Sequence, residues 1–284
     1  MKKIRYLIEA ALLYLLFTAF RILPLDVASW IGGFMARAIG PFLSAHKTAQ
    51  KNLSMVFPEM PAQQQRELLT RMWDNLGRVA AELPNLPYEK LIRRVNVHGL
   101  EHLPDPDVPV IFFSGHIGNW ELAYPIARKH DRPITLVYRH ANNPYVDAMI
   151  ANLRASQADD MLPKGGRGSV RLGRAIKSKY SLAMLVDQKM NEGIAVPFFG
   201  RDAMTPPAIA DFALRYDLPL IPARVVRTRG CHFEIMIYPP LVYEETGDQD
   251  KDILAIMTQI NQLLESWIRE YPEQWFWVHK RWPN

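Results

Sequence analysis

The chain has 284 residues, 49% of them hydrophobic and 22% charged, which is enough apolar material to bury a substantial core. Its net charge is +5, but it has neither zinc-finger spacing nor an aromatic RNP-type strand, so the common nucleic-acid-binding modules are excluded. One cysteine, Cys231, excludes an internal disulfide and a cysteine-based metal cluster, and fits a reducing compartment.

The positive charge gathers at the N-terminal end. Residues 1–60 hold seven Lys and Arg against three Asp and Glu, and supply +4 of the net charge. An apolar run extends there from Ala10 to Phe20, and a second from Val27 to Leu43 is interrupted by Arg37 and by Gly32-Gly33. A basic segment beside apolar runs indicates an anionic lipid surface rather than nucleic acid.

Residues 1–45 are therefore predicted to form a membrane anchor, either as one short span or as a pair of interfacial helices. The first uncharged run has 11 residues, whereas a full span needs about 20. Two buried helices of a soluble domain are the alternative. No linker is visible in residues 60–284, so residues 46–284 are predicted to form a single domain behind this anchor.

The next segment, residues 62–83, has apolar residues at three-four spacing and predicts a helix, which Pro84 and Pro87 end. Val95 to Gly99 predicts a short strand. Short apolar runs then alternate with helical patterns. Strands are predicted at 110–114, 134–138, 182–186, 220–226 and 233–238, and helices at 122–129, 143–155, 169–178, 206–216 and 250–270.

This alternation is typical of βαβ units. It predicts an α/β fold with a mixed, largely parallel central sheet flanked by helices, carrying the N-terminal membrane-associated helical segment. The stretch from Arg224 to Leu241 predicts a hairpin around Thr228-Arg229-Gly230, which makes the sheet mixed.

One predicted strand-to-helix turn holds a histidine and a carboxylate that could act in catalysis. Gly115-His116-Ile117-Gly118-Asn119-Trp120-Glu121 follows the apolar run 110–113 and precedes a predicted helix. A neutral imidazole can take the proton of a hydroxyl group that attacks a carbonyl, and an adjacent carboxylate can hold the imidazole in the required tautomer. We interpret His116 as a general base and Glu121 as its orienting acid.

The spacing constrains where this histidine can lie. A five-residue step on a helix turns about 500° and would leave the two side chains about 140° apart. For the pair to touch, His116 must precede the helix, on a turn that Gly115 and Gly118 allow to bend. The alternative is a histidine that is hydrogen-bonded in the core.

Other candidate sites are weaker. His102 and Asp107 have the same spacing, but they lie in a Pro-rich loop without a preceding strand, so we interpret that match as chance. No second histidine lies at zinc-ligand spacing from His116, and no Gly-x-Ser-x-Gly elbow surrounds Ser114. Neither a metal nor a cofactor is expected.

Further blocks follow in order along the chain: Val137-Tyr138-Arg139 with Asn142-Asn143-Pro144, Asp187-Gln188 at the end of a core strand, Val196 to Gly200 with Thr205, Ile221-Pro222, and Pro272 to Trp282. With the histidine block, which looks like an H-x4-D/E motif, they resemble the lysophospholipid acyltransferase superfamily. More specifically, nearly the whole chain resembles the late acyltransferases of lipid A biosynthesis, of the lauroyl/myristoyl transferase type.

The resemblance implies that residues 46–284 form an acyltransferase catalytic domain, with His116 as the base and Glu121 as its partner. A hydroxyl of a lipid A precursor would attack an acyl thioester carried on acyl carrier protein. The enzyme would act at the bacterial inner membrane, on the cytoplasmic face, in contact with membrane lipids. Substrate-binding roles are implied for Arg139, Asn142, Arg154, Asp187 and Asn119.

Alternatives remain open at this point. The acceptor could be a lyso-glycerophospholipid, an ornithine lipid or a glycosylated lipid, or the fold could serve a non-catalytic protein that binds lipid or carrier. Arg139, Arg154 and Asp187 could instead form structural ion pairs. The tryptophan-rich segment 272–282 could pack in the core or lie at a membrane interface.

Overall fold

The computed structural model describes residues 2–85, 89–138, 141–155, 160–163 and 166–282. The helices in this part of the chain are α1 (Lys2–Ile22), α2 (Leu25–Ile39), α3 (Ser44–Val56), α4 (Ala62–Glu82), α5 (Glu89–Ile92), α6 (Ala123–Lys129), α7 (Pro144–Ala155), α8 (Gly166–Lys177), α9 (Ala208–Tyr216) and α10 (Gln249–Glu270). The strands are β1 (Val95–His98), β2 (Ile111–Ser114), β3 (Ile134–Tyr138), β4 (Asp160–Pro163), β5 (Ser181–Leu185), β6 (Ile194–Phe198), β7 (Arg201–Thr205), β8 (Leu220–Arg229) and β9 (His232–Ile237).

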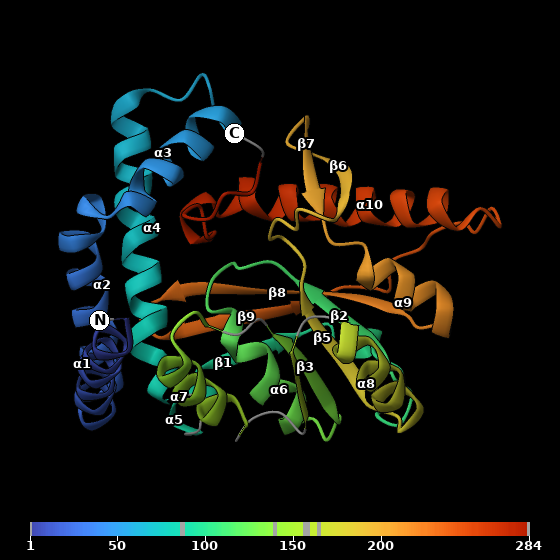
Figure 1. Ribbon diagram of the computed structural model, residues 1–284, viewed down its shortest axis with the longest axis horizontal. Coiled ribbons are helices and arrows are strands. Elements are labelled where there is room, and N and C mark those ends of the chain that lie inside the picture. The colour runs from blue at the N-terminus through green and yellow to red at the C-terminus, as the bar shows by residue number, and fades with distance from the viewer. Residues whose placement is uncertain (1, 86–88, 139–140, 156–159, 164–165, 283–284) are drawn as a thin grey trace.

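The central sheet has seven strands in the order β1-β9-β8-β2-β5-β3-β4 (Figure 1). Its strand pairs are parallel except for β8 and β9, which form the predicted antiparallel hairpin. The predicted α/β class and the largely parallel sheet are therefore confirmed.

Two features of the sheet region differ from the prediction. The short strand β4 and the separate antiparallel hairpin of β6 and β7 were not expected. Asp160–Pro163 is only four residues long and holds an acid and a proline, so it carries no apolar signal. In β6, Pro197 likewise breaks the sequence pattern expected of a strand.

Helices cover both faces of the sheet. Alternate residues of each strand point to opposite sides, so the apolar side chains on both faces need a covering layer. On β2, Ile111 and Phe113 pack with apolar residues of α4, α8, α9 and α10, whereas Phe112 faces the side of α6. The central strands are buried on both faces, which explains why they read as unbroken apolar runs.

The N-terminal helices pack on this body rather than standing apart from it. In Figure 1, α1, α2 and α4 lie side by side at one edge of the molecule, and α1 also contacts α7. A Cβ added at Gly32 of α2 would lie 2.4 Å from the main-chain oxygen of Gly77 in α4, so the glycine permits the close crossing. Arg37 pairs with Asp74 of α4. The residues that interrupt the second apolar run therefore form its packed face, and the division at residue 45 stays a prediction.

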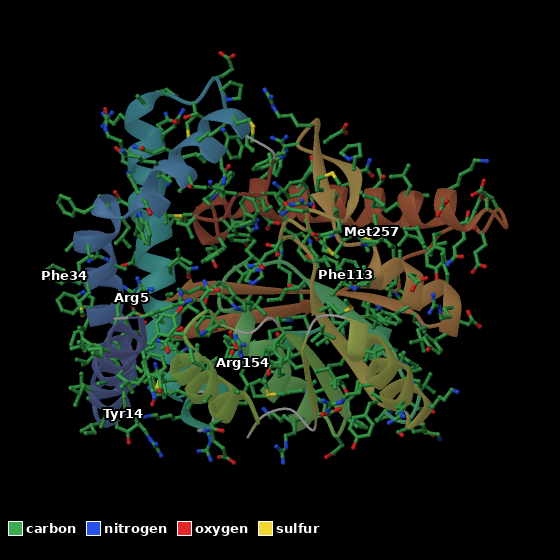
Figure 2. All side chains as sticks on the ribbon, viewed as in Figure 1. Arg5, Tyr14, Phe34, Phe113, Arg154 and Met257 are labelled. Atoms are coloured by element: carbon green, nitrogen blue, oxygen red, sulfur yellow. The ribbon has the colours of Figure 1, made fainter. Side chains whose placement is uncertain are left out.

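The opposite faces of α1 and α2 are apolar and exposed. Large side chains that are 42–78% exposed cover them: Ile4, Leu7, Ile8, Leu12, Tyr14, Leu15, Ile22, Val27, Trp30, Phe34 and Ile39. Figure 2 shows Tyr14 and Phe34 at the outer edge of the molecule, away from the central sheet. Among the described residues, we find no helix with the length and apolar content that crossing a bilayer requires.

Candidate active site

The candidate site forms where two neighbouring parallel strands end. Ser114 at the end of β2 lies beside Leu185 at the end of β5, and His116 and Asp187 each follow two residues later. Because parallel strands end at the same edge of the sheet, these two side chains come together. The Nδ1 atom of His116 lies 2.7 Å from Oδ1 of Asp187.

Asp187 is fully buried and receives three hydrogen bonds from two residues. Besides the ring of His116, the main-chain N–H of His116 donates to Oδ2 at 2.7 Å, and Nε1 of Trp275 donates to the same oxygen at 2.8 Å. Burial alone would raise the pKa of the Asp187 carboxyl, but the charge and hydrogen bonds of His116 outweigh it and hold this pKa well below its usual range.

The ionised carboxylate fixes the tautomer that the imidazole adopts when it is neutral. A carboxylate only accepts hydrogen bonds, so the proton of the ring sits on Nδ1 and Nε2 keeps its lone pair. The His116 side chain is 14% exposed. An imidazole held in this tautomer can accept a proton at Nε2.

The turn that carries His116 is held by close backbone contacts. Gly118 has φ of +62°, and a Cβ there would lie 2.2 Å from the main-chain oxygen of Val225. Gly115 serves a different purpose, because a Cβ there would lie 3.1 Å from Oδ2 of Asp187. The histidine lies on the turn before the helix, as the spacing required, and both glycines are explained.

The C-terminal segment closes the turn from the other side. Ile117 forms an antiparallel bridge with Trp275, and the N–H of Phe276 donates to the main-chain oxygen of His116 at 3.0 Å. The rings of Trp120 and Phe276 lie 5.1 and 5.6 Å from the imidazole ring. These two rings also contact each other at 5.9 Å, so the imidazole packs with them in one aromatic cluster.

The predicted contact between His116 and Glu121 is wrong in this structure. The Glu121 carboxylate instead accepts hydrogen bonds from Nε of Arg154 at 2.9 Å, from a second Arg154 nitrogen and from Nε1 of Trp120 at 3.2 Å. The reason is local: Asn119 caps the short 3-10 helix Trp120–Leu122 by accepting from the N–H of Glu121, which turns the acid toward α7.

The other predicted site residues have different surroundings. Arg154 lies on α7 beside Glu121, so the structure brings these two together, and Figure 2 shows Arg154 near the middle of the molecule. Asn119 is fully buried and donates to Oε2 of Glu82 at 2.8 Å, so it lies behind the site rather than on its surface. Asn142 is exposed before α7. Arg139 lies outside the described residues.

One of the weaker candidate sites can be checked directly. His102 lies near Glu101 and Asp107 pairs with Lys179, so the second His/Asp match is a coincidence of spacing, as expected. Burial raises the pKa of the Cys231 thiol to about 12, which leaves it protonated. In the described ranges, no group of three His, Cys, Asp or Glu residues could hold a metal ion.

The C-terminal tryptophans belong to the core. Trp275, Trp277 and Trp282 are at most 5% exposed, which confirms core packing over a membrane interface. Sequence reasoning did not assign a role in the site to Trp275, to Gln188 or to His279, which approaches the main-chain oxygen of Asp187 at 3.1 Å. Their membership of a block was visible, but which atom each one contacts was not.

Comparison with known proteins adds the following. Residues 1–284 match the family model described as bacterial lipid A biosynthesis acyltransferase. A lipid A biosynthesis lauroyltransferase of Escherichia coli is 24% identical over 250 residues, which cover 83% of this chain and 78% of that protein. A lipid A biosynthesis palmitoleoyltransferase of the same organism is 23% identical over 271 residues, which cover 91% and 86%. Among solved structures, the 1-acyl-sn-glycerophosphate acyltransferase PlsC from Thermotoga maritima matches with a TM-score of 0.37 and 14% identity, over 94% of this chain and 100% of that one.

Proposed function

The chain belongs to the bacterial lipid A biosynthesis acyltransferase family, and from that premise we propose that it transfers a fatty acyl chain from an acyl thioester to a hydroxyl of a lipid A precursor. The observation that carries the mechanism is the imidazole of His116, oriented by a buried carboxylate 2.7 Å from its Nδ1 atom. Acyl carrier protein is the proposed donor, since its thioester supplies the activated acyl group that such a base can use.

The proposed reaction needs one proton shuttle. The Nε2 atom of His116 takes the proton of the acceptor hydroxyl while the hydroxyl oxygen bonds to the thioester carbonyl carbon. The C–S bond then breaks, and the imidazolium returns the proton to the leaving thiolate. The charge on Asp187 stabilises the imidazolium in between. The products are an ester and a free thiol.

The polar side of the site fits an anionic or sugar-bearing acceptor. Arg154 is held by the Glu121 carboxylate, and its side chain is 21% exposed. A guanidinium pairs well with phosphate, so we assign Arg154, with Arg139 and Asn142, to the acceptor headgroup. In this assignment Glu121 orients Arg154 rather than the base.

An assay with defined substrates tests the proposal. Purified protein is incubated with an acyl carrier protein thioester and a lipid A precursor, and the molecular mass of the lipid is measured by mass spectrometry. We expect the precursor to gain the mass of one acyl chain. Transfer to a lyso-glycerophospholipid and none to the lipid A precursor would contradict the acceptor, and no transfer to any hydroxyl lipid would contradict the reaction.

We further propose that the enzyme works at the bacterial inner membrane, on the cytoplasmic face, with α1 and α2 lying in the interface. The exposed apolar side chains of these helices and the basic residues Lys2, Lys3 and Arg5 support this placement. An amphipathic helix pair with flanking cations binds anionic lipid through apolar burial and electrostatic attraction together.

A double variant of α1, Ile8→Glu with Leu12→Glu, should release the protein from anionic vesicles. Both side chains are more than half exposed, and burying such a side chain contributes about 1.5–3 kcal/mol. Losing two, at about 1.5 kcal/mol each or more, should lower the vesicle partition coefficient measured by co-sedimentation by at least about 100-fold. Deleting residues 1–25 is a less clean test, because it also removes the buried Phe17 and Phe20.

The matched control is Val242→Glu, because Val242 is 85% exposed but lies in the loop before α10. This variant should bind vesicles like the wild type. Undiminished co-sedimentation of the α1 double variant would show that these helices do not make the membrane contact.

A further inference from the structure

The side-chain amide of Gln188 stands at the lone pair of the catalytic base. Its Nε2 atom lies 3.3 Å from Nε2 of His116, on the side of the ring opposite Asp187. Because Asp187 holds the ring proton on Nδ1, the neutral imidazole accepts at Nε2 and the amide N–H donates. Gln188 therefore occupies the position that a substrate hydroxyl needs in order to reach the base.

The main chain around Gln188 is fixed on both sides. The N–H of Val186 donates to the main-chain oxygen of Ser114 at 3.0 Å, and the N–H of Met190 donates to that of Met204 at 3.1 Å. His279 approaches the main-chain oxygen of Asp187. Any substrate must therefore displace the side chain of Gln188 while its backbone stays in place.

The side chain itself is loosely held. It is only partly buried, and within the described part of the chain its amide makes no hydrogen bond other than the one to His116. At 3.3 Å this bond is at the long end of the normal range, so its net contribution is modest. A ligand that fills the site and offers its own hydroxyl can replace it.

We propose that Gln188 is a specificity-determining residue that caps the base against water and gives way to the lipid hydroxyl. This inference rests on the proposed function of the same site. Water is always present, whereas the lipid acceptor arrives only when it is bound. A base left open beside a bound thioester would therefore activate water and waste the acyl donor.

The two competing reactions differ only in the nucleophile. With a lipid hydroxyl, the new C–O bond replaces the C–S bond and yields an ester and a thiol. With water, the same exchange yields a free fatty acid and a thiol. In both, His116 takes one proton from the attacking oxygen and returns it to the thiolate sulfur, so no further reactant is needed.

The test compares hydrolysis with transfer in Gln188→Ala and Gln188→Leu. Free fatty acid and acylated lipid are measured in one reaction with an acyl carrier protein thioester and a lipid acceptor. We expect the ratio of hydrolysis to transfer to rise roughly two- to tenfold in Gln188→Ala, the range for losing one neutral hydrogen bond. Gln188→Leu should show a smaller rise, because its bulk still hinders water.

The ratio is independent of how much enzyme is folded, so a purely structural loss would leave it unchanged. Gln262→Ala is the matched control, since Gln262 is exposed on α10 and should keep the wild-type ratio. An unchanged ratio in Gln188→Ala overturns the proposal. No transfer from the acyl carrier protein thioester to any hydroxyl lipid by the wild-type protein would instead overturn the proposed function, so the two failures are distinguishable.

Discussion

Replacing Asp187 by asparagine is expected to lower kcat for acyl transfer by about 10⁴-fold, the loss that the same exchange causes in the serine protease triad. The reason is the tautomer. The amide introduced by Asp187→Asn can donate to Nδ1 of His116, which moves the ring proton to Nε2 and removes the lone pair that the acceptor hydroxyl needs. Steady-state kinetics with saturating lipid acceptor measure this loss.

His116→Ala should remove the proposed base and lower kcat by about 10²–10⁴-fold. His98→Ala and Asp202→Asn are matched controls, because both residues are exposed on β1 and β7 rather than on the turn of His116, and both variants should keep wild-type rates. Full activity of His116→Ala would exclude its role as the base.

Glu121→Gln separates the two carboxylates. If Asp187 orients the base, this variant weakens the hold on Arg154 and should raise KM for the acceptor more than it lowers kcat. A wild-type rate in Asp187→Asn together with a large loss of kcat in Glu121→Gln would show that Glu121, not Asp187, supports the histidine during the reaction.

The second large effect is on stability and concerns Glu82. Its carboxylate is fully buried in α4 and accepts hydrogen bonds from Ser29 at 2.7 Å, from Asn119 at 2.8 Å and from Arg227 at 2.5 and 2.9 Å. Glu82→Ala leaves the guanidinium of Arg227 without its partner in a buried setting. We expect the free energy of unfolding in urea to fall by about 3–5 kcal/mol.

Two further variants test whether the unpaired charge of Arg227 causes this loss of stability. Replacing both partners, with Glu82→Leu and Arg227→Met, removes the unpaired charge and should restore part of the lost stability. The recovery is incomplete, because Ser29 and Asn119 also lose the carboxylate as their acceptor. Glu67→Ala, at an exposed position of the same helix, should change the unfolding free energy by less than about 0.5 kcal/mol. A loss below about 1 kcal/mol in Glu82→Ala would show that the pair is not needed for folding.

The same carboxylate ties three parts of the protein together. Ser29 belongs to α2, whose outer face we assign to the membrane, and Asn119 belongs to the turn that carries His116. Losing Glu82 therefore removes a link between α2 and this turn, along with the pairing of Arg227.

The fold could be predicted from the sequence wherever a strand or turn leaves a local pattern of apolar or turn residues. Both faces of β2 are covered, so the strand is an apolar run, Ile111-Phe112-Phe113. Such runs can be recognised from the sequence alone. The antiparallel hairpin of β8 and β9 was legible from its turn at Gly230. β4 was not, because Asp160–Pro163 pairs at an edge and buries too little apolar surface to leave a pattern.

The same distinction between local and long-range information applies to the candidate site. His116 does lie before the helix, but this position was predicted from a contact with Glu121 that the structure does not make. The contact of Asp187 with the His116 ring could not be predicted, because it depends on β5 being the neighbour of β2, and the two residues are 71 positions apart in the chain. Strand order is set by the packing of the whole domain. Sequence spacing therefore favoured Glu121, the nearest acid, over Asp187.

The C-terminal segment that closes the turn of His116 also has a consequence for the order of folding. Asn52 donates to the main-chain oxygen of Trp277 across 225 positions, and Trp275 donates to Asp187 across 88. Contacts of such separation form only after a large loop-closure entropy has been overcome, so they come late. His116 and Asp187 acquire their final geometry when this segment docks, so we expect enzymatic activity to report the last step of refolding, after the sheet has formed.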